Sequence, residues 1–199
     1  RTKSKAEKWI KDYKGKMAET PAEAAKDAEF IFTCVGNDND LREVTFGDNG
    51  AFKTIKEGSV YIDNTTASAT IAREIYDYAK KNNFGALDAP VSGGQAGAEN
   101  GALTVMIGGD QSDFEKAEDK IDCYSKKMKL LGKAGSGQLA KMVNQICIAG
   151  LVQGLSEGIN FGMKAGLNME DVIEVISKGA AQSWLSLIHI SEPTRRRTI

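Results

Sequence analysis

Short apolar runs that end in turn residues recur along the first two thirds of the chain. The first, EFIFTCV, is followed at once by Gly36-Asn37-Asp38. A continuous apolar run of this length is typical of a strand buried on both faces of a parallel sheet. The runs that predict strands are residues 29–35, 59–63, 84–88, 103–107 and 127–131.

Helix-forming stretches alternate with these strands. Thr20-Pro21-Ala22-Glu23 is a favourable helix start, because Thr can cap the helix, Pro fits its first position and Glu its third. Strands that alternate with helices predict a doubly wound, Rossmann-like α/β sheet. The other predicted helices cover residues 6–17, 41–46, 51–55, 69–81 and 111–121.

The pattern changes after Gly137 to one long predicted helix over residues 138–164, and residues 168–178 begin another. Within the long helix a glycine recurs every fourth residue, at positions 150, 154, 158 and 162. Each interior glycine costs a helix about 1 kcal/mol relative to alanine. We therefore expect this stripe to pack closely against another helix, from the same subunit or a neighbour. The pattern predicts the start of an all-helical domain.

The last fifteen residues break this periodicity. Residues 185–195 read LSLIHISEPTR, which resembles the in-frame translation of a sequencing adapter. We therefore expect residues 185–199 to be foreign to the natural protein and exclude them from the fold. The chain also opens on Arg1-Thr2-Lys3, within a charged run and without Met. We expect its natural N-terminus to lie upstream.

Composition narrows the possible partners. The 199 residues are 41% hydrophobic with a formal net charge of −1, which gives no reason to expect nucleic acid. No apolar run approaches the roughly 20 residues of a membrane-spanning helix. Cys34, Cys123 and Cys147 are widely scattered, which fits a reducing cytoplasm. The only histidine, His189, lies in the foreign tail, so no zinc site is expected.

Two constellations suggest chemistry. Ligands of open α/β sheets bind beyond the carboxyl ends of the strands, and Ser92-Gly93-Gly94 follows such an end closely. Glycines there let backbone N–H groups approach an anion such as a carboxylate. Lys141 and Asn144 share one face of the long helix, three residues apart. A lysine partly withdrawn from water can have its pKa lowered into a range useful for acid–base catalysis, although most lysines are simply solvated.

Together these segments resemble the β-hydroxyacid dehydrogenase family, which includes 3-hydroxyisobutyrate dehydrogenase and tartronate semialdehyde reductase. Residues 88–109, DAPVSGGQAGAENGALTVMIGG, resemble its substrate loop, and residues 132–145, GKAGSGQLAKMVNQ, its catalytic-lysine segment. FTCVGNDNDLREVTFG and YIDNTTAS resemble its cofactor-side loops, and GLSEGINFGMKAGL its interdomain helix. The resemblance covers residues 1–184 and implies that the first strand of the sheet, with its GxGxxG loop, is missing. It implies a partial dinucleotide-binding domain over residues 1–134 and the start of a helical substrate or dimerisation domain over residues 135–184.

The resemblance also implies a role for each matched residue. Lys141 would exchange a proton with the substrate oxygen, while NAD or NADP exchanges the hydride. Ser92, Gly93 and Gly94 would hold the substrate carboxylate. Asn144 would orient the substrate, a role that Gln145 could share because many relatives have Asn at its position. The residues implied to line the cofactor are Arg1, Thr2, Val35, Gly36 and Thr66.

The implied activity is hydride transfer between NAD(P) and a small 3-hydroxy acid or the matching semialdehyde acid. Arg1-Thr2 resembles the end of the family's second strand, where arginine can grip the ribose 2′-phosphate, and so favours NADP over NAD. A tartronate semialdehyde reductase, or another short semialdehyde reductase, would use the same residues. An alternative of another class is a non-catalytic module for nucleotide binding or oligomerisation. We expect a homo-oligomer when the protein is complete, and an inactive protein from this chain alone.

Overall fold

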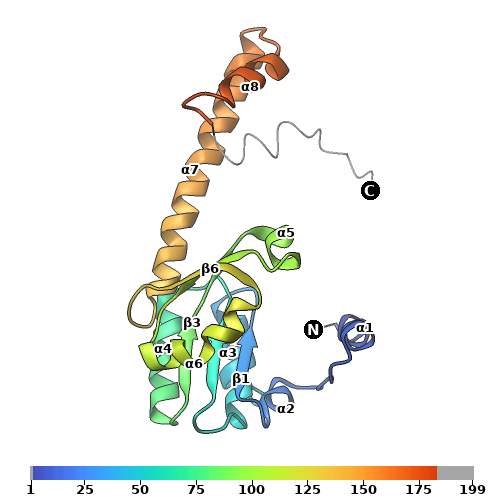
Figure 1. The fold of residues 1–199 in the computed structure, drawn as a ribbon, viewed down its shortest axis with the longest axis vertical. Coiled ribbons are helices and arrows are strands. Elements are labelled where there is room, and N and C mark those ends of the chain that lie inside the picture. The colour runs from blue at the N-terminus through green and yellow to red at the C-terminus, as the bar shows by residue number, and fades with distance from the viewer. Residues whose placement is uncertain (1, 183–199) are drawn as a thin grey trace. The chain divides into compact units, whose positions relative to one another are not determined.

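A computed structural model describes residues 2–182 of the chain (Figure 1). These residues form two compact units, which divide between Met142 and Val143. The division lies inside the long helix α7 (Ser136–Lys164). The residues expected to be foreign, 185–199, lie outside the described part, as does Arg1.

Three parallel strands form the first sheet, in the order β1 (Phe30–Thr33), β2 (Val60–Asp63), β3 (Gly85–Asp88). Strands β2 and β3 are buried along their whole length, as continuous apolar runs predict. Strand β1 differs, because it forms the edge of this sheet in the described part of the chain and the Phe32 side chain is 42% exposed. The prediction of a strand within residues 29–35 is confirmed, but its burial on both faces is not.

A second three-stranded sheet continues from the first. Strand β5 (Leu103–Ile107) pairs antiparallel with β4 (Val91–Ser92) and parallel with β6 (Ser125–Leu130). A single antiparallel bridge between Asp88 and Gly108 connects the two sheets. The sequence did not predict β4, because two residues are too few to form a hydrophobic pattern.

The helices of the first unit agree with most of the predicted segments. Thr20 caps the second one, since its Oγ1 accepts a hydrogen bond from the Glu23 N–H at 3.1 Å. The first helix was predicted to continue to residue 17, but it ends at Tyr13 because the next residue, Lys14, adopts a left-handed conformation (φ 55°). The helix over residues 94–99 was not predicted. The elements are α1 (Lys3–Tyr13), α2 (Pro21–Ala25), α3 (Asp38–Phe46), the 3-10 helix η1 (Ala51–Lys53), α4 (Ala69–Lys81), α5 (Gly94–Glu99) and α6 (Gln111–Asp122).

Helices cover both faces of the parallel sheet, as a doubly wound fold requires. Alternate residues of β2 enter opposite cores: Tyr61 packs with residues of α3 and α4, whereas Val60 and Ile62 pack with residues of α6. In the first core the Phe52 ring lies 5.0 Å from that of Tyr61, between centroids, in an edge-to-face arrangement. Such pairs contribute about 0.5–1.5 kcal/mol beyond their buried area. The Rossmann-like α/β sheet, followed by a long helix, is therefore confirmed.

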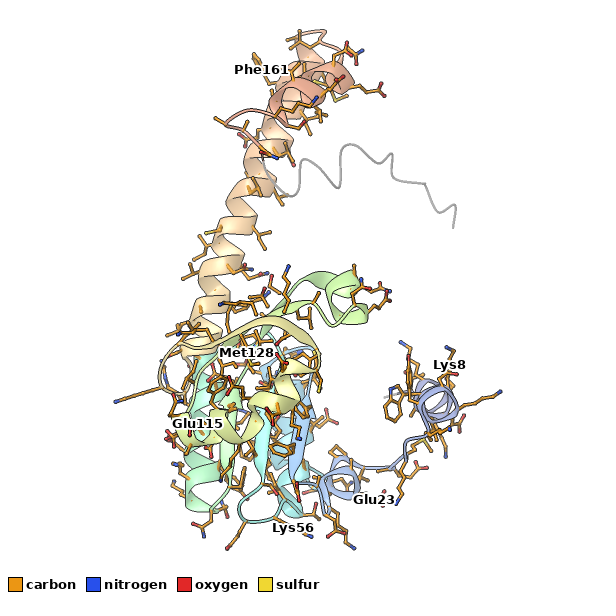
Figure 2. All side chains as sticks on the ribbon, viewed as in Figure 1. Lys8, Glu23, Lys56, Glu115, Met128 and Phe161 are labelled. Atoms are coloured by element: carbon orange, nitrogen blue, oxygen red, sulfur yellow. The ribbon has the colours of Figure 1, made fainter. Side chains whose placement is uncertain are left out.

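The second unit contains most of α7 and the helix α8 (Met169–Ile176). Apart from the chain neighbours of each glycine and the backbone of the helix itself, no described residue lies within 4 Å of a Cβ placed at Gly150, Gly154 or Gly158. The closely packed helix expected along the stripe is therefore not found at these three glycines within the described part of the chain; at the fourth, Gly162, a Cβ would contact the Met169 side chain of α8. The Phe161 side chain, labelled in Figure 2, is 73% exposed. Over residues 2–182, no helix combines the length and the apolar character needed to cross a membrane.

Candidate active site

Lys141 is a buried lysine in the first unit. Its residue is only 7% exposed, and its Nζ donates a hydrogen bond to the Val91 carbonyl oxygen at 2.8 Å. Among the described residues, no carboxylate forms an ion pair with this ammonium. Burial therefore acts unopposed and lowers the pKa of Lys141. Val91 immediately precedes Ser92, so the structure brings the predicted lysine to the predicted carboxylate loop.

Ser92, Gly93 and Gly94 lie at the transition from β4 to α5. Ser92 belongs to β4 and pairs with Thr104, so it is part of a strand rather than a loop. Gly93 and Gly94 are exposed and have positive φ angles of 141° and 62°, which side-chain-bearing residues rarely adopt. The exposed backbone of these glycines leaves room for an anion to approach.

Asp88 holds the start of the helix that carries Lys141. Its carboxylate accepts hydrogen bonds from the backbone N–H of Gly135 at 2.7 Å and of Gln138 at 2.9 Å. The first N–H groups of a helix have no partner within the helix, so this carboxylate acts as a cap. Burial raises the pKa of Asp88, and the two N–H bonds oppose that rise. A Cβ at Gly137 would lie 2.6 Å from the Asp88 carbonyl oxygen, so glycine is needed for this close approach.

Gln138 joins this helix start to the loop after β2. Its side chain is fully buried; Nε2 donates to the Thr65 carbonyl oxygen at 2.7 Å and Oε1 accepts from the Ala67 N–H at 3.0 Å. Both ends of the amide are thus bonded to the loop between β2 and α4. Thr66, one of the predicted cofactor contacts, lies between the two bonded residues and is exposed.

The loops after β1 and β2 are tied to each other below the surface. Thr65 Oγ1 accepts the Val35 N–H at 3.0 Å, and Asp63 Oδ1 accepts both the Thr65 N–H and the Thr33 hydroxyl at 3.0 Å. Asp63 is 3% exposed, and burial raises its pKa to about 6. Because the two strands are parallel, these loops leave the sheet at the same end, where the carboxyl ends of the strands lie.

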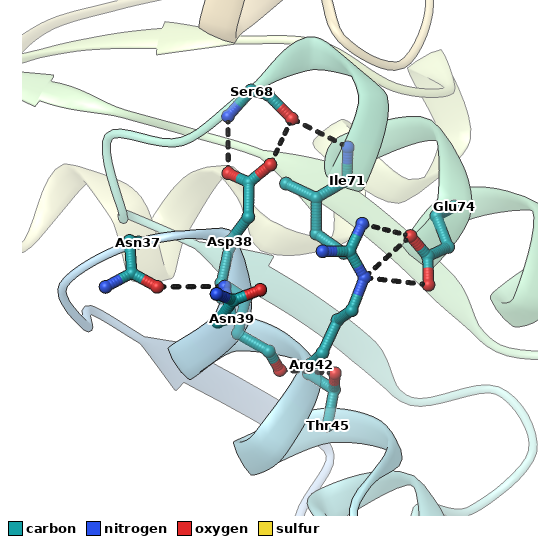
Figure 3. Close-up of polar contacts among 9 residues, drawn as sticks. Asn37, Asp38, Asn39, Arg42, Thr45, Ser68, Ile71 and Glu74 are labelled. Carbon is teal, nitrogen blue, oxygen red and sulfur yellow. Dashed lines mark hydrogen bonds and ion pairs between the residues drawn. The ribbon is translucent and has the colours of Figure 1, made fainter.

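The outer part of these loops is also fixed by polar contacts (Figure 3). Asn37 caps α3 through its Oδ1, and the Asp38 carboxylate accepts the Ser68 N–H at 2.9 Å and the Ser68 hydroxyl at 2.5 Å. Gly36 is exposed, and its N–H donates to Asp40 Oδ2 at 3.1 Å. The structure therefore brings Val35, Gly36 and Thr66 to the same end of the sheet, beyond the carboxyl ends of β1 and β2.

Other predicted site residues are not brought to this end of the sheet by any described contact. Thr2 is exposed at the start of α1, where its carbonyl oxygen accepts the Lys5 N–H, and no hydrogen bond of the described residues joins it to the loops above. Arg1 lies outside the described residues. Asn144 and Gln145 belong to the second unit, where Asn144 Nδ2 donates to Gln145 Oε1 at 3.0 Å.

Three buried polar residues of this site, Asp63, Asp88 and Gln138, received no role from the sequence. The two aspartates end apolar runs, and a carboxylate at the end of a buried strand is itself a usable signal. Gln138 carried no such signal in the sequence, because a single glutamine at the start of a helix is usually solvated. Within residues 2–182, no group of three or more histidine, cysteine, aspartate and glutamate side chains could hold a metal ion.

Comparisons with known proteins show which family this chain is similar to. Residues 1–132 match the NAD binding domain of 6-phosphogluconate dehydrogenase, and residues 135–198 match the NAD-binding domain of NADP-dependent 3-hydroxyisobutyrate dehydrogenase. An uncharacterized oxidoreductase of Shewanella frigidimarina is 58% identical over 92% of this chain and 63% of its own length. The mitochondrial 3-hydroxyisobutyrate dehydrogenase of Mus musculus is 32% identical over 90% of the chain and 53% of its own length.

Among solved structures, Mycobacterium tuberculosis 3-hydroxyisobutyrate dehydrogenase with L-serine superposes with a TM-score of 0.79 at 28% identity. That match covers 88% of this chain and 60% of the other. The chain thus spans less than two thirds of the length of these relatives. With a Rossmann-like NAD-binding domain, a buried lysine beside the SGG segment and relatives of this kind, the chain belongs to the β-hydroxyacid dehydrogenase family of oxidoreductases.

Proposed function

We propose that the protein carrying this chain transfers hydride between NAD(P) and a small 3-hydroxy acid or the matching semialdehyde acid, with Lys141 as general acid and base. The observation that supports this most is the buried Lys141 ammonium, 2.8 Å from the carbonyl of the residue before Ser92. A 3-hydroxyisobutyrate-type substrate is the first candidate. Tartronate semialdehyde and other short semialdehydes would use the same groups.

The described residues fit a nicotinamide cofactor at the end of the sheet beyond β1 and β2. Gly36 and Thr66 are exposed there, and the bond from Val35 to Thr65 keeps the two loops together. Val35, Gly36 and Thr66 would line the nicotinamide side, with Arg1 and Thr2 at the ribose. A bound nicotinamide supplies the hydride chemistry. Arg1 and the NADP-dependent family model support NADP over NAD.

Lys141 would protonate the aldehyde oxygen during reduction and take the proton from the hydroxyl in the reverse direction. A lysine ammonium has three donors, so it can keep its bond to the Val91 carbonyl while it donates to a substrate oxygen. The Val91 carbonyl would thus fix the orientation of the Lys141 ammonium without neutralising its charge.

The carboxylate of the substrate would bind at Ser92, Gly93 and Gly94, next to the residue that holds Lys141. Asn144, or Gln145 one position later, would orient the substrate. This arrangement requires an acid with its reacting carbon a short distance from the carboxylate, which favours small substrates.

The remaining features of the whole protein are also proposals. We propose a dinucleotide-binding domain over residues 1–134 and the start of a helical domain over residues 135–184. We propose that the glycine stripe packs against another helix of a homo-oligomer, because interior glycines otherwise only weaken the helix. The cytoplasmic location expected from the scattered cysteines remains a prediction.

The test is turnover by the protein expressed from its complete gene. Small 3-hydroxy acids and semialdehyde acids are assayed with NADP(H) and NAD(H), for the parent, a Lys141→Met variant and a Lys127→Met control on the exposed part of β6. We expect Lys141→Met to reduce kcat by at least about 100-fold, the usual contribution of a general acid, with cofactor affinity unchanged. Full turnover by Lys141→Met would remove the lysine from the mechanism. Cofactor binding without turnover by the parent would instead favour a non-catalytic nucleotide-binding module.

A further inference from the structure

The side chain of Gln138 has no exposed surface, and both of its polar atoms are used within one loop. Nε2 donates to the Thr65 carbonyl at 2.7 Å, and Oε1 accepts from the Ala67 N–H at 3.0 Å. Leaving either group buried without a partner is unfavourable, so the amide and the loop must move together. The bonded residues flank Thr66, the proposed cofactor contact.

The backbone of Gln138 belongs to a different part of the site. Its N–H donates to Asp88 Oδ2 at 2.9 Å at the start of α7. Lys141 follows one helical turn later and is held by the Val91 carbonyl. A displacement of this helix start would therefore move the lysine relative to the SGG segment.

The chain of contacts also reaches the loop after β1. Thr65, whose carbonyl accepts from Gln138, accepts the Val35 N–H through its side chain at 3.0 Å. One buried residue thus connects the proposed cofactor loops to the helix that carries the proposed acid. All of these contacts lie within the first unit.

We propose that Gln138 is a positioning residue that couples the cofactor loops to the placement of Lys141, so that cofactor and substrate each strengthen the binding of the other. The inference rests on the proposed function, because it uses the proposed roles of Thr66 and Lys141. Reciprocal coupling between two sites typically changes each affinity by 5- to 150-fold.

The experiment measures that coupling directly in the protein expressed from its complete gene. NADPH and NADH are titrated by fluorescence in the absence and presence of saturating 3-hydroxyisobutyrate; reduced cofactor and alcohol cannot react, so only binding is measured. For the parent we expect the hydroxy acid to tighten binding of the reduced cofactor at least about fivefold. For Gln138→Met, which removes both side-chain bonds, we expect this ratio to fall to near 1.

Two controls separate positioning from general damage. Gln111→Met makes the same substitution on the exposed start of α6, where the amide bonds only Glu115, and should keep the parent ratio. If Gln138→Met does not fold, Gln138→Asn keeps an amide but is one methylene shorter, so it cannot span both bonds and should also lose the coupling. Thermal unfolding of each variant confirms that a folded protein is compared.

The outcomes distinguish this inference from the proposed function. Absence of turnover by the parent with any of the tested acids would contradict the proposed function. If the parent turns over 3-hydroxyisobutyrate and a folded Gln138 variant retains its full coupling ratio, the positioning role is wrong. The Lys141→Met variant should lose both turnover and the coupling, because the proposed coupling reaches the substrate through the Lys141 ammonium, which is held by the Val91 carbonyl; full coupling in this variant would contradict that route.

Discussion

Replacing Asp63 with Asn should remove a pH-dependent destabilisation of the folded protein. Asp63 is 3% exposed, and burial raises its pKa from the usual 3.8 to about 6. The folded state therefore binds this proton more tightly than the unfolded state does. The resulting stabilisation is fully present below about pH 4 and is lost as the pH rises through 6.

The size of the effect follows from the difference between the two pKa values. A difference of about two units, at 1.36 kcal/mol each, corresponds to about 3 kcal/mol between pH 4 and pH 7.5. Asn retains an Oδ1 that can accept from the Thr33 hydroxyl and the Thr65 N–H, the two bonds that Asp63 makes with one oxygen. The variant should thus lose the titration while keeping these contacts.

The assay is urea unfolding of parent and Asp63→Asn at several pH values from 4.5 to 8. The free energy of unfolding of the variant minus that of the parent should increase with pH. Asp110→Asn is a control, because a hydrogen bond from Lys80 lowers the pKa of Asp110 below its usual 3.8; this carboxyl is ionised in both the folded and the unfolded state over the whole range, so its difference should stay nearly constant with pH. A difference for Asp63→Asn that stays constant with pH would refute the argument that Asp63 is ionised at a cost.

Four further predictions concern the helix that carries the lysine. Asp88→Asn should lower the free energy of unfolding by about 1–3 kcal/mol, because each carboxylate oxygen accepts a backbone N–H and Asn would face one of them with an NH2 group; equal urea midpoints would contradict the cap. Gly137→Ala should destabilise by at least about 1–3 kcal/mol, since its Cβ would lie 2.6 Å from the Asp88 carbonyl oxygen. At Gly150 an added Cβ would meet no other side chain, so Gly150→Ala should stabilise the monomer by about 1 kcal/mol. If the substitution instead weakens an oligomer, the glycine stripe lies in its interface. On the proposed role of Lys141, reduction requires the protonated amine, so kcat/KM should fall as pH rises through a pKa that burial has lowered below 10.5; a profile that stays flat to pH 10.5 would exclude this role.

The sequence predicted most elements of the fold, because burial leaves a periodic pattern in it. The strand over residues 103–107 and the helix over residues 69–81 were predicted to the residue. Strand β4 was missed, since two residues have no period. The exposure of Phe32 was also missed, because an apolar run indicates a strand but not its place in the sheet.

In the candidate site too, some residues could be predicted from the sequence and others could not. Lys141 and the SGG segment could be predicted because they lie in local motifs, and the structure adds that Val91 connects them. The contacts of Gln138 could not be predicted, since its partners Thr65 and Ala67 are more than 70 residues away in the sequence. A side chain that bonds both partners from one position has no counterpart in periodicity or composition.

This division indicates where the specificity of the site lies. The segments recognised from sequence contain the proposed acid, a lysine ammonium, and the proposed carboxylate site, the exposed glycine backbone. The buried groups Asp63, Asp88 and Gln138 are proposed to provide their relative placement, because each forms hydrogen bonds to a segment that is distant in the sequence. A relative that keeps the motifs but replaces Gln138 with an apolar residue would retain the same reacting groups. On the proposed role of Gln138, it would lose the coupling between cofactor and substrate, so natural variation at this position should follow that coupling rather than the presence of the lysine.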